Sequence, residues 1–182
     1  MAASWAIVTA HAGVPRWEAH LFRRVNDLPP SLWPFLRVPM QLGSIVGSLL
    51  VVAAIGARTR DLRLTLATLV GSQAAYWGAK VVKSTVARGR PDVLLRGVHV
   101  REHPAGFGYV SGHSSVAFAL AAAIAPSLAA RWQVVAALLA IVVAFARVYA
   151  GAHFPLDVVG GAGLGLLCGT VSRWVFGVGR AT

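Results

Sequence analysis

Five apolar segments, each close to the length of a membrane-spanning helix, constrain this chain of 182 residues more than any other feature. A helix needs about 20 predominantly apolar residues to cross a bilayer. The segments cover residues 38–57, 62–82, 114–130, 132–147 and 155–176. The composition agrees, because 57% of the residues are hydrophobic and only 13% are charged. We therefore predict an all-α, polytopic membrane bundle of about five spanning helices.

Residues 1–37 differ in character from the rest of the chain. The stretch WEAHLFRRVNDLPPSLWPFLR mixes aromatic and aliphatic residues with arginines and is broken at Pro29 and Pro30. Aromatic and basic side chains of this kind anchor helices at the membrane surface. We predict an N-terminal interfacial segment over residues 1–37, with a loosely structured tail as the alternative, followed by one membrane-embedded domain over residues 38–178. The first residues lack the basic start of a signal peptide.

The net charge of +11 comes from 17 Lys and Arg residues against 6 Asp and Glu residues. Such an excess suits nucleic acid, anionic lipid headgroups or a phosphorylated substrate. Because the basic residues border the apolar segments and no nucleic-acid motif is present, we expect a lipid bilayer and a phosphate group as partners, and no nucleic acid. The single cysteine, Cys168, predicts no disulfide framework.

A stripe of small residues runs along the last apolar segment, where Gly161, Gly165 and Gly169 recur at every fourth position. Such a stripe lets two helices approach closely. Packing within one chain is the favoured interpretation and a dimer contact the alternative, so the oligomeric state stays open.

Three polar clusters interrupt the apolar pattern: KSTVARGRPD after the second segment, YVSGHSS before the third, and RVYAGAHFPLD between the fourth and fifth. Antiparallel spans would bring all three clusters to one membrane face. Cationic side chains bind phosphate oxygens, as do a hydroxyl and backbone N–H groups at the start of a helix. The candidate phosphate-binding residues are accordingly Lys83, Arg90, Ser111, Gly112 and Arg147.

The candidate catalytic residues are His113, His153 and Asp157. Two imidazoles can supply a nucleophile or base and an acid. Asp157 follows His153 by four residues, and if Pro155 begins the fifth helix, its carboxylate can reach back to the imidazole and fix the tautomer. Each cluster alone is weak, but their joint occurrence in this order between these segments indicates a site.

The clusters resemble the three signature motifs of the type 2 phosphatidic acid phosphatase superfamily. Those motifs read Lys, six residues, Arg-Pro; then Pro-Ser-Gly-His; then Ser-Arg, five residues, His, three residues, Asp. Their counterparts here begin at Lys83, Val110 and Ala146. Val110 replaces the usual proline, and Ala146 replaces the usual serine, so that one hydroxyl donor is missing. The short N-terminal region resembles that of bacterial undecaprenyl pyrophosphate phosphatases.

The resemblance implies a lipid phosphatase that needs no metal or other cofactor. His153 would attack phosphorus to form a phosphohistidine, Asp157 would orient it, and His113 would protonate the leaving oxygen and then activate water. The resemblance favours a polyprenyl phosphate or diphosphate as substrate, with phosphatidate and phosphatidylglycerol phosphate as alternatives. It also implies an extracytoplasmic site in a bacterial plasma membrane. Taken literally, the positive-inside rule favours the opposite orientation, because 11 of the 17 basic residues fall on the catalytic face. Three of these, Lys83, Arg90 and Arg147, are assigned to the substrate, and the remaining 8 against 6 decide little.

Three other classes of protein compete with this interpretation. Haloperoxidases and acid phosphatases share the motifs but are water-soluble, which this apolar chain is not. A phosphate or lipid transporter would explain apolar spans with cations, but it needs no His–Asp pair at this spacing. A purely structural membrane protein would explain only the glycine stripe. Phosphate release from a lipid separates an enzyme from the last two classes.

Overall fold

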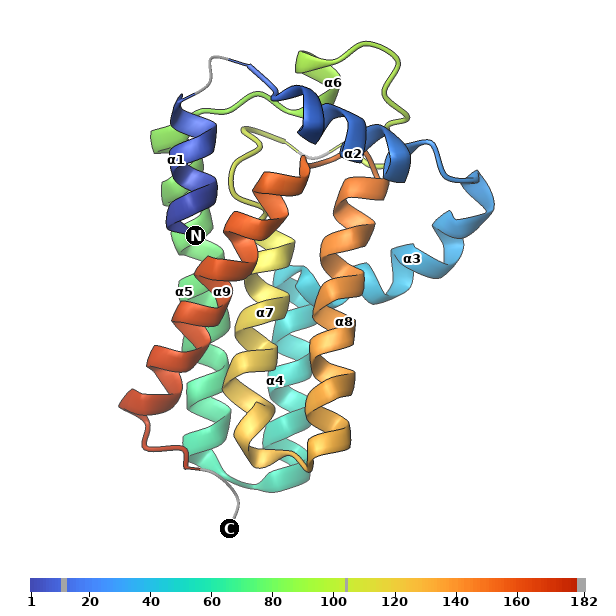
Figure 1. The fold of residues 1–182 in the computed structure, drawn as a ribbon. Helices are drawn as coiled ribbons and strands as arrows, with labels where there is room; N and C mark the ends of the chain where they lie inside the picture. Colours follow the sequence, from blue (N-terminus) through green and yellow to red (C-terminus); the bar gives the residue numbers. More distant parts are fainter. Residues whose placement is uncertain (11–12, 104, 180–182) are drawn as a thin grey trace.

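The computed structural model describes residues 1–10, 13–103 and 105–179, and it forms a helical bundle in which the described residues include no β-strand (Figure 1). Five helices run along the bundle, and shorter helices gather around one of its ends. The long helices are α4 (Ile45–Thr59), α5 (Leu62–Val86), α7 (Gly112–Ile124), α8 (Ala130–Tyr149) and α9 (Pro155–Val175). The short ones are α1 (Ala2–Ala10), α2 (Arg16–Asn26), α3 (Trp33–Met40) and α6 (Pro91–Leu94), with 3-10 turns at Pro30–Leu32, Gln41–Gly43 and Ala125–Ser127. The predicted all-α class is confirmed.

Two of the helices, α8 and α9, are long and apolar enough to cross a membrane by themselves, and the bent pair Pro30–Gly43 and Ile45–Thr59 would supply a third span. The other two long helices depart from an ideal span, since α7 has only 13 residues and α5 has 25 residues but includes charged side chains. The bundle is therefore that of a membrane protein, while the number of five spans stays a prediction.

The first predicted span, over residues 38–57, is not one continuous helix, and the prediction is wrong in this respect. The chain bends by 68° between Pro30–Gly43 and α4. Ser44 begins α4 as its N-cap, because its side chain accepts a hydrogen bond from the backbone N–H of Gly47 at 2.9 Å. The bend brings Gly43 against the start of α7, where an added Cβ would lie 2.5 Å from the carbonyl oxygen of His113. Only glycine permits this approach.

The third predicted span, over residues 114–130, also differs from the structure. α7 begins at Gly112 and ends at Ile124, and a 3-10 turn with Pro126 in it follows. Proline has no N–H to continue the helical hydrogen bonds and its ring clashes with the preceding turn, so it ends the helix. The other predicted spans lie within α5 and α8 and nearly coincide with α9.

The glycine stripe of α9 packs against the backbone of α7. A Cβ added to Gly161 would lie 2.5 Å from the carbonyl oxygen of Ser111, and Gly165 and Gly169 make equally close approaches to the carbonyl oxygens of Ser115 and Ala119. The two helices thus touch along the length of α7. This is the packing within one chain that the sequence favoured.

Helix α2 lies across the end of the bundle where α5 and α8 end and α7 and α9 begin (Figure 1). One face of α2 is buried against the protein and carries Glu18, Phe22 and Asn26. The opposite face leaves Trp17 and Leu21 exposed. A helix was predicted here, but its buried face includes a carboxylate that the sequence analysis had not used. The location of α2 at a membrane interface stays a prediction.

Candidate active site

A pocket of about 630 Å³ lies where α5 and α8 end and α7 begins, and six of the eight predicted site residues line it. They come from the end of α5 and the loop after it, the start of α7, the end of α8 and the loop before α9, which is the convergence that antiparallel helices require. The six are Lys83, Arg90, Gly112, His113, Arg147 and His153. The remaining two, Ser111 and Asp157, are fully buried just outside the lining.

His153 and Asp157 form the pair that the sequence predicted. Pro155 is the first residue of α9, which places Asp157 in the first turn, where its Oδ2 accepts a hydrogen bond from the backbone N–H of Phe154 at 2.8 Å. The same oxygen lies 3.6 Å from Nδ1 of His153, which is buried without a hydrogen-bond partner among the described residues. Catalytic hydrogen bonds are often this long without substrate and shorten when it binds.

The imidazole of His153 is neutral in this environment. The residue lies between α8 and α9 and is only 2% exposed. Burial, and then the positive charges of Lys83, Arg147 and Arg90, hold the pKa of His153 well below 6.5. A neutral imidazole keeps a free lone pair on the nitrogen that faces away from Asp157, which is the state that a nucleophile needs.

A buried ion-pair network supports Asp157 from behind. The guanidinium of Arg88 donates to Oδ1 of Asp157 at 2.8 Å and to Oε2 of Glu18 at 2.6 Å. Oε1 of Glu18 accepts a hydrogen bond from the backbone N–H of Leu156 at 2.9 Å. Arg88 also stacks over the ring of Phe154 at 4.7 Å. Glu18 therefore joins α2 to the first turn of α9, and Arg88 fixes the orientation of the Asp157 carboxylate.

Lys83 and Arg90, two of the predicted phosphate-binding cations, bind the loop at residues 105–107, which lines the pocket. Lys83 Nζ donates to the carbonyl oxygen of Phe107 at 2.8 Å. The guanidinium of Arg90 donates to three carbonyl oxygens at 2.6–2.8 Å, those of Ala105, Gly106 and Ala152. Arg90 has five N–H donors, so two of them remain for a ligand. Both side chains thus shape the pocket and line it.

The third cation, Arg147, is paired with an acid inside the pocket. Its side chain is 1% exposed and donates to Oε1 of Glu102 at 2.6 Å. Glu102 also lines the pocket, so the ion pair faces the same space as the predicted site residues. Nε of Arg147 is buried with no partner among the described residues. The Glu102 carboxylate thus binds the arginine that is predicted to bind phosphate.

Ser111 and Gly112 play different parts at the start of α7. Ser111 is the N-cap of the helix, and its hydroxyl oxygen accepts from the backbone N–H of Ser114 at 3.4 Å. Ser111 is therefore not among the residues that line the pocket, and its contact with phosphate stays a prediction. Gly112 does line the pocket, and a Cβ there would meet no other atom within 4 Å. The N-terminal end of α7, with its partial positive charge, faces open space.

Sequence reasoning missed three residues of this site: Glu18, Arg88 and Glu102. Arg88 stands two residues before Arg90 and was passed over because the motif spacing selects Arg90. Glu18 lies in a segment read as interfacial, and Glu102 lies in a loop without a motif. A signal was available, since the chain has only six acidic residues and a rare acid in an apolar protein often has a cationic partner.

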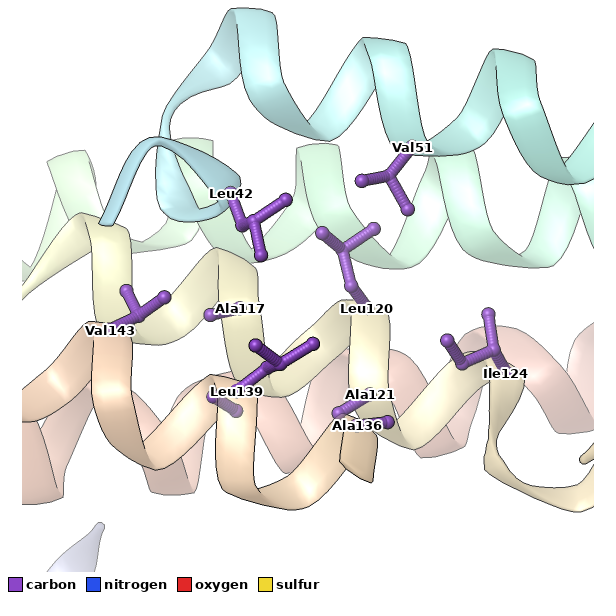
Figure 2. A pocket seen from close by; sticks show the side chains of 10 residues that line it. Leu42, Val51, Ala117, Leu120, Ala121, Ile124, Ala136, Leu139 and Val143 are labelled. Atoms are coloured by element: carbon purple, nitrogen blue, oxygen red, sulfur yellow. The ribbon is translucent and has the colours of Figure 1, made fainter. Parts of the chain in front are cut away.

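A second pocket of about 140 Å³ lies between α4, α7 and α8, and aliphatic side chains line it (Figure 2). Figure 2 shows Val51, Leu120 and Leu139 of these helices converging with Leu42 of the 3-10 turn Gln41–Gly43. Ala117 of α7 and Val143 of α8 also line it. Ala117 is four residues from His113 and Val143 is four residues from Arg147, and both His113 and Arg147 line the 630 Å³ pocket, here called the catalytic pocket. An apolar pocket therefore begins one helical turn from the polar one.

Comparison with known proteins decides the family. The model of the PAP2 superfamily matches residues 62–180, which is more than half of the chain and includes all three polar clusters. The chain belongs to the PAP2 superfamily. The resemblance predicted from the motifs is thereby confirmed, and His113, His153 and Asp157 lie in the matched PAP2 region.

Individual PAP2 proteins support the same assignment. Phosphatidylglycerophosphatase B of Bacillus subtilis (strain 168) is 36% identical over 98 residues, which are 48% of this chain and 46% of that protein. The alignment thus spans less than half of that relative. The crystal structure of LpxE from Aquifex aeolicus matches 88% of this chain and 97% of its own, with a TM-score of 0.81 and 24% identity.

The crystal structure of a transmembrane PAP2-type phosphatidylglycerolphosphate phosphatase from Bacillus subtilis matches 97% of this chain and 94% of its own, with a TM-score of 0.80 and 24% identity. At 24% identity these two structures establish the shared membrane fold.

Among the described residues, no three His, Cys, Asp or Glu side chains gather into a group that would hold a metal ion. The acidic side chains near the pocket are instead paired with arginines. Independence from metal stays a prediction that requires a direct test.

Proposed function

We propose that this protein is an integral membrane lipid phosphatase that hydrolyses a phosphate monoester or diphosphate on a lipid through a phosphohistidine. One observation carries the proposal: a buried, neutral His153 backed by Asp157 lies in the same pocket as His113 and the three cations Lys83, Arg90 and Arg147, so that all three polar clusters contribute to it. A transporter requires cations but not this pair.

The geometry supports a two-step reaction. Nδ1 of His153 faces Asp157, so Nε2 attacks phosphorus, and the bond to the leaving oxygen breaks as its electron pair departs. His113 donates a proton to that oxygen and then removes one from the water that hydrolyses the phosphohistidine. Asp157 stabilises the positive charge that His153 acquires in the first step.

The phosphoryl oxygens are held by Lys83, Arg90 and Arg147 and by the backbone at Gly112. Donors already directed at the position where charge develops contribute the largest share of many enzymatic rate enhancements. Glu102 leaves Arg147 when phosphate arrives, because a dianionic phosphate offers more acceptor oxygens than one carboxylate.

A lipid tail suits the apolar surroundings of the pocket. The lining of that pocket continues along α5 from Lys83 through Lys80 and Ala79 to Tyr76, and this path leads the tail away from the end of the bundle. A polyprenyl phosphate or diphosphate is the favoured substrate because the motifs and the N-terminal interfacial segment resemble those of the carrier-lipid phosphatases. Phosphatidylglycerol phosphate is the second candidate, favoured by the 36% identity to phosphatidylglycerophosphatase B. The proposed location is a bacterial plasma membrane with the pocket on the extracytoplasmic side.

The test is phosphate release by the purified protein from a panel of lipids: polyprenyl diphosphate and monophosphate, phosphatidate and phosphatidylglycerol phosphate. His153→Ala should abolish release while the protein stays folded in detergent. His20→Ala is the matched control, because His20 is exposed on α2 and its loss should leave the rate unchanged. Release from no lipid by the folded wild-type protein, or full activity of His153→Ala, would overturn the proposal.

A further inference from the structure

Lys80 is a cation of the catalytic pocket that the proposed reaction does not use. It lies on α5 three residues before Lys83, and both residues line the pocket together with His113 and His153. Residues three apart on a helix share a face. At a rise of about 1.5 Å per residue, Lys80 is roughly 4.5 Å further from the catalytic end of α5 than Lys83 is. Lys80 therefore lies on the side of the phosphoryl site that faces the bilayer interior.

The ammonium group of Lys80 is directed away from the end of the bundle. Its Nζ lies 4.9 Å from the ring centroid of Tyr76 and 4.7 Å from that of Trp77. Both aromatic residues precede Lys80 on α5 and so lie deeper, and their rings contact each other edge-on at 5.3 Å. A lysine near the end of a span ordinarily extends toward the membrane surface. Here the Lys80 ammonium group instead lies against the rings of Tyr76 and Trp77, on the side away from the end of the bundle.

The charge of Lys80 has no ion-pair partner within the part of the chain that the structure describes. Its neighbours Lys83, Arg90 and Arg147 add positive charge to the same pocket. Lys80 is exposed, and an ionisable side chain in a helix of a membrane bundle is a candidate for a ligand site. The ligand for a cation would be an anion.

The chemistry of the substrate identifies that anion. The phosphoryl group under attack lies at His153 and the hydrocarbon tail lies in the bilayer, so the atoms that pass Lys80 join the two. In a lipid diphosphate they form the inner phosphate, and in phosphatidylglycerol phosphate they form the phosphodiester. A lipid monophosphate has no anionic group there.

We propose that Lys80 binds a second phosphate group between the scissile phosphoryl group and the lipid tail, so that the protein selects lipids with two phosphates over lipids with one. This proposal rests on the proposed lipid phosphatase function. As Nε2 of His153 bonds to the terminal phosphorus, the bridging P–O bond breaks and its electron pair stays on the inner phosphate. Lys80 balances the negative charge that this leaving group gains, and it takes no part in hydrolysis of the phosphohistidine.

The experiment compares two substrates with one tail, farnesyl monophosphate and farnesyl diphosphate, in detergent micelles. Lys80→Met should lower kcat/KM for the diphosphate roughly 10- to 100-fold, the range of one charge-assisted hydrogen bond, and change the monophosphate rate much less. Lys80→Arg, which keeps the charge, should retain most of the preference. Arg131→Met is the matched control, because it removes a cation that rests on Trp132 at 5.9 Å at the opposite end of the bundle.

Three results would overturn the proposal: equal losses on both substrates, no loss on the diphosphate, or the same loss in Arg131→Met. A wild-type protein without preference for the diphosphate would also overturn it. Failure of the lipid phosphatase function itself gives a different result, namely no phosphate release from either substrate by the wild-type protein.

Discussion

Replacement of Glu18 tests whether a helix at the end of the bundle controls the catalytic pair. Glu18 is fully buried and accepts hydrogen bonds from Arg88 and from the backbone N–H of Leu156. Removal of one partner from a buried ion pair costs about 3–5 kcal/mol. In Glu18→Ala the N–H of Leu156 also loses its acceptor, which adds about 1–3 kcal/mol. Glu18→Gln keeps that acceptor and should cost less than alanine.

Activity should fall together with stability, because Arg88 then has only Asp157 as a buried partner. A shift of about 1 Å in a positioning group can lower a rate on the order of 100-fold, so we expect a 10- to 100-fold loss of kcat in Glu18→Gln. KM should change less, because Glu18 does not line the pocket. The assays are thermal unfolding in detergent by tryptophan fluorescence, and phosphate release.

The double variant provides the sharpest test of the network. Arg88→Gln leaves two buried carboxylates, Glu18 and Asp157, without their cation, and should be more harmful than Glu18→Gln. The addition of Glu18→Gln to Arg88→Gln removes one of those carboxylates and should recover part of the stability, a coupling that independent sites do not show. Asp27→Asn is the control, because Asp27 is 55% exposed and 3.7 Å from His99, and such changes usually stay within about 0.5 kcal/mol. Additive effects, or a Glu18→Gln variant that matches Asp27→Asn, would refute the reasoning.

The remaining predictions concern the reaction, the metal, the pH dependence and the orientation. Loss of His113 should harm hydrolysis of nitrophenyl phosphate less than that of an alkyl phosphate, because a good leaving group needs little protonation; equal losses would remove His113 from the role of acid. A chelator should leave the rate unchanged and vanadate should inhibit, since the cations of the pocket do what magnesium would do; strict magnesium dependence would contradict this. The pKa of His153 is held well below 6.5 by burial and the nearby cations, so below pH 6.5 the unfolded chain binds a proton that the folded protein does not, and stability falls. As the pH is lowered from about 7 to about 5, the free energy of unfolding should decrease less in His153→Asn than in the wild type. Equal decreases in the two proteins would show that His153 is not the group responsible. In a Cys168→Ala background, an impermeant thiol reagent on intact cells should label a cysteine at Arg96 but not one at Arg60, and the reverse pattern would invert the orientation.

The sequence predicted best what depends on neighbouring residues. The pair of His153 and Asp157 follows from a four-residue spacing and from Pro155 at the start of a helix, and the structure forms it. The apolar runs of α8 and α9 likewise mark those helices, because a helix that crosses lipid needs about 20 predominantly apolar residues. Local pattern and structure agree in these places.

Features that depend on distant contacts could not be predicted in this way. The bend before α4 has no proline at its centre and arises where Gly43 packs on His113, 70 positions away in the chain. The partners Glu18 and Arg88 are also 70 residues apart. Contacts between residues so far apart produce no periodic pattern in the sequence. The contacts of Gly43 with His113 and of Glu18 with Arg88 are therefore seen only in the folded bundle.

The distribution of acids and cations explains how a pocket with so many positive charges is stable without substrate. Three of the carboxylates at this end of the bundle are paired with an arginine: Glu18 and Asp157 with Arg88, and Glu102 with Arg147. Of these pairs, only Glu102 with Arg147 lines the pocket. Lys83 and Arg90 are held by backbone carbonyl oxygens, which use only part of their hydrogen-bond donors and leave their charges uncompensated. The resting pocket therefore retains a net positive charge that one exchangeable carboxylate reduces, and a phosphate that displaces Glu102 meets donors already in place.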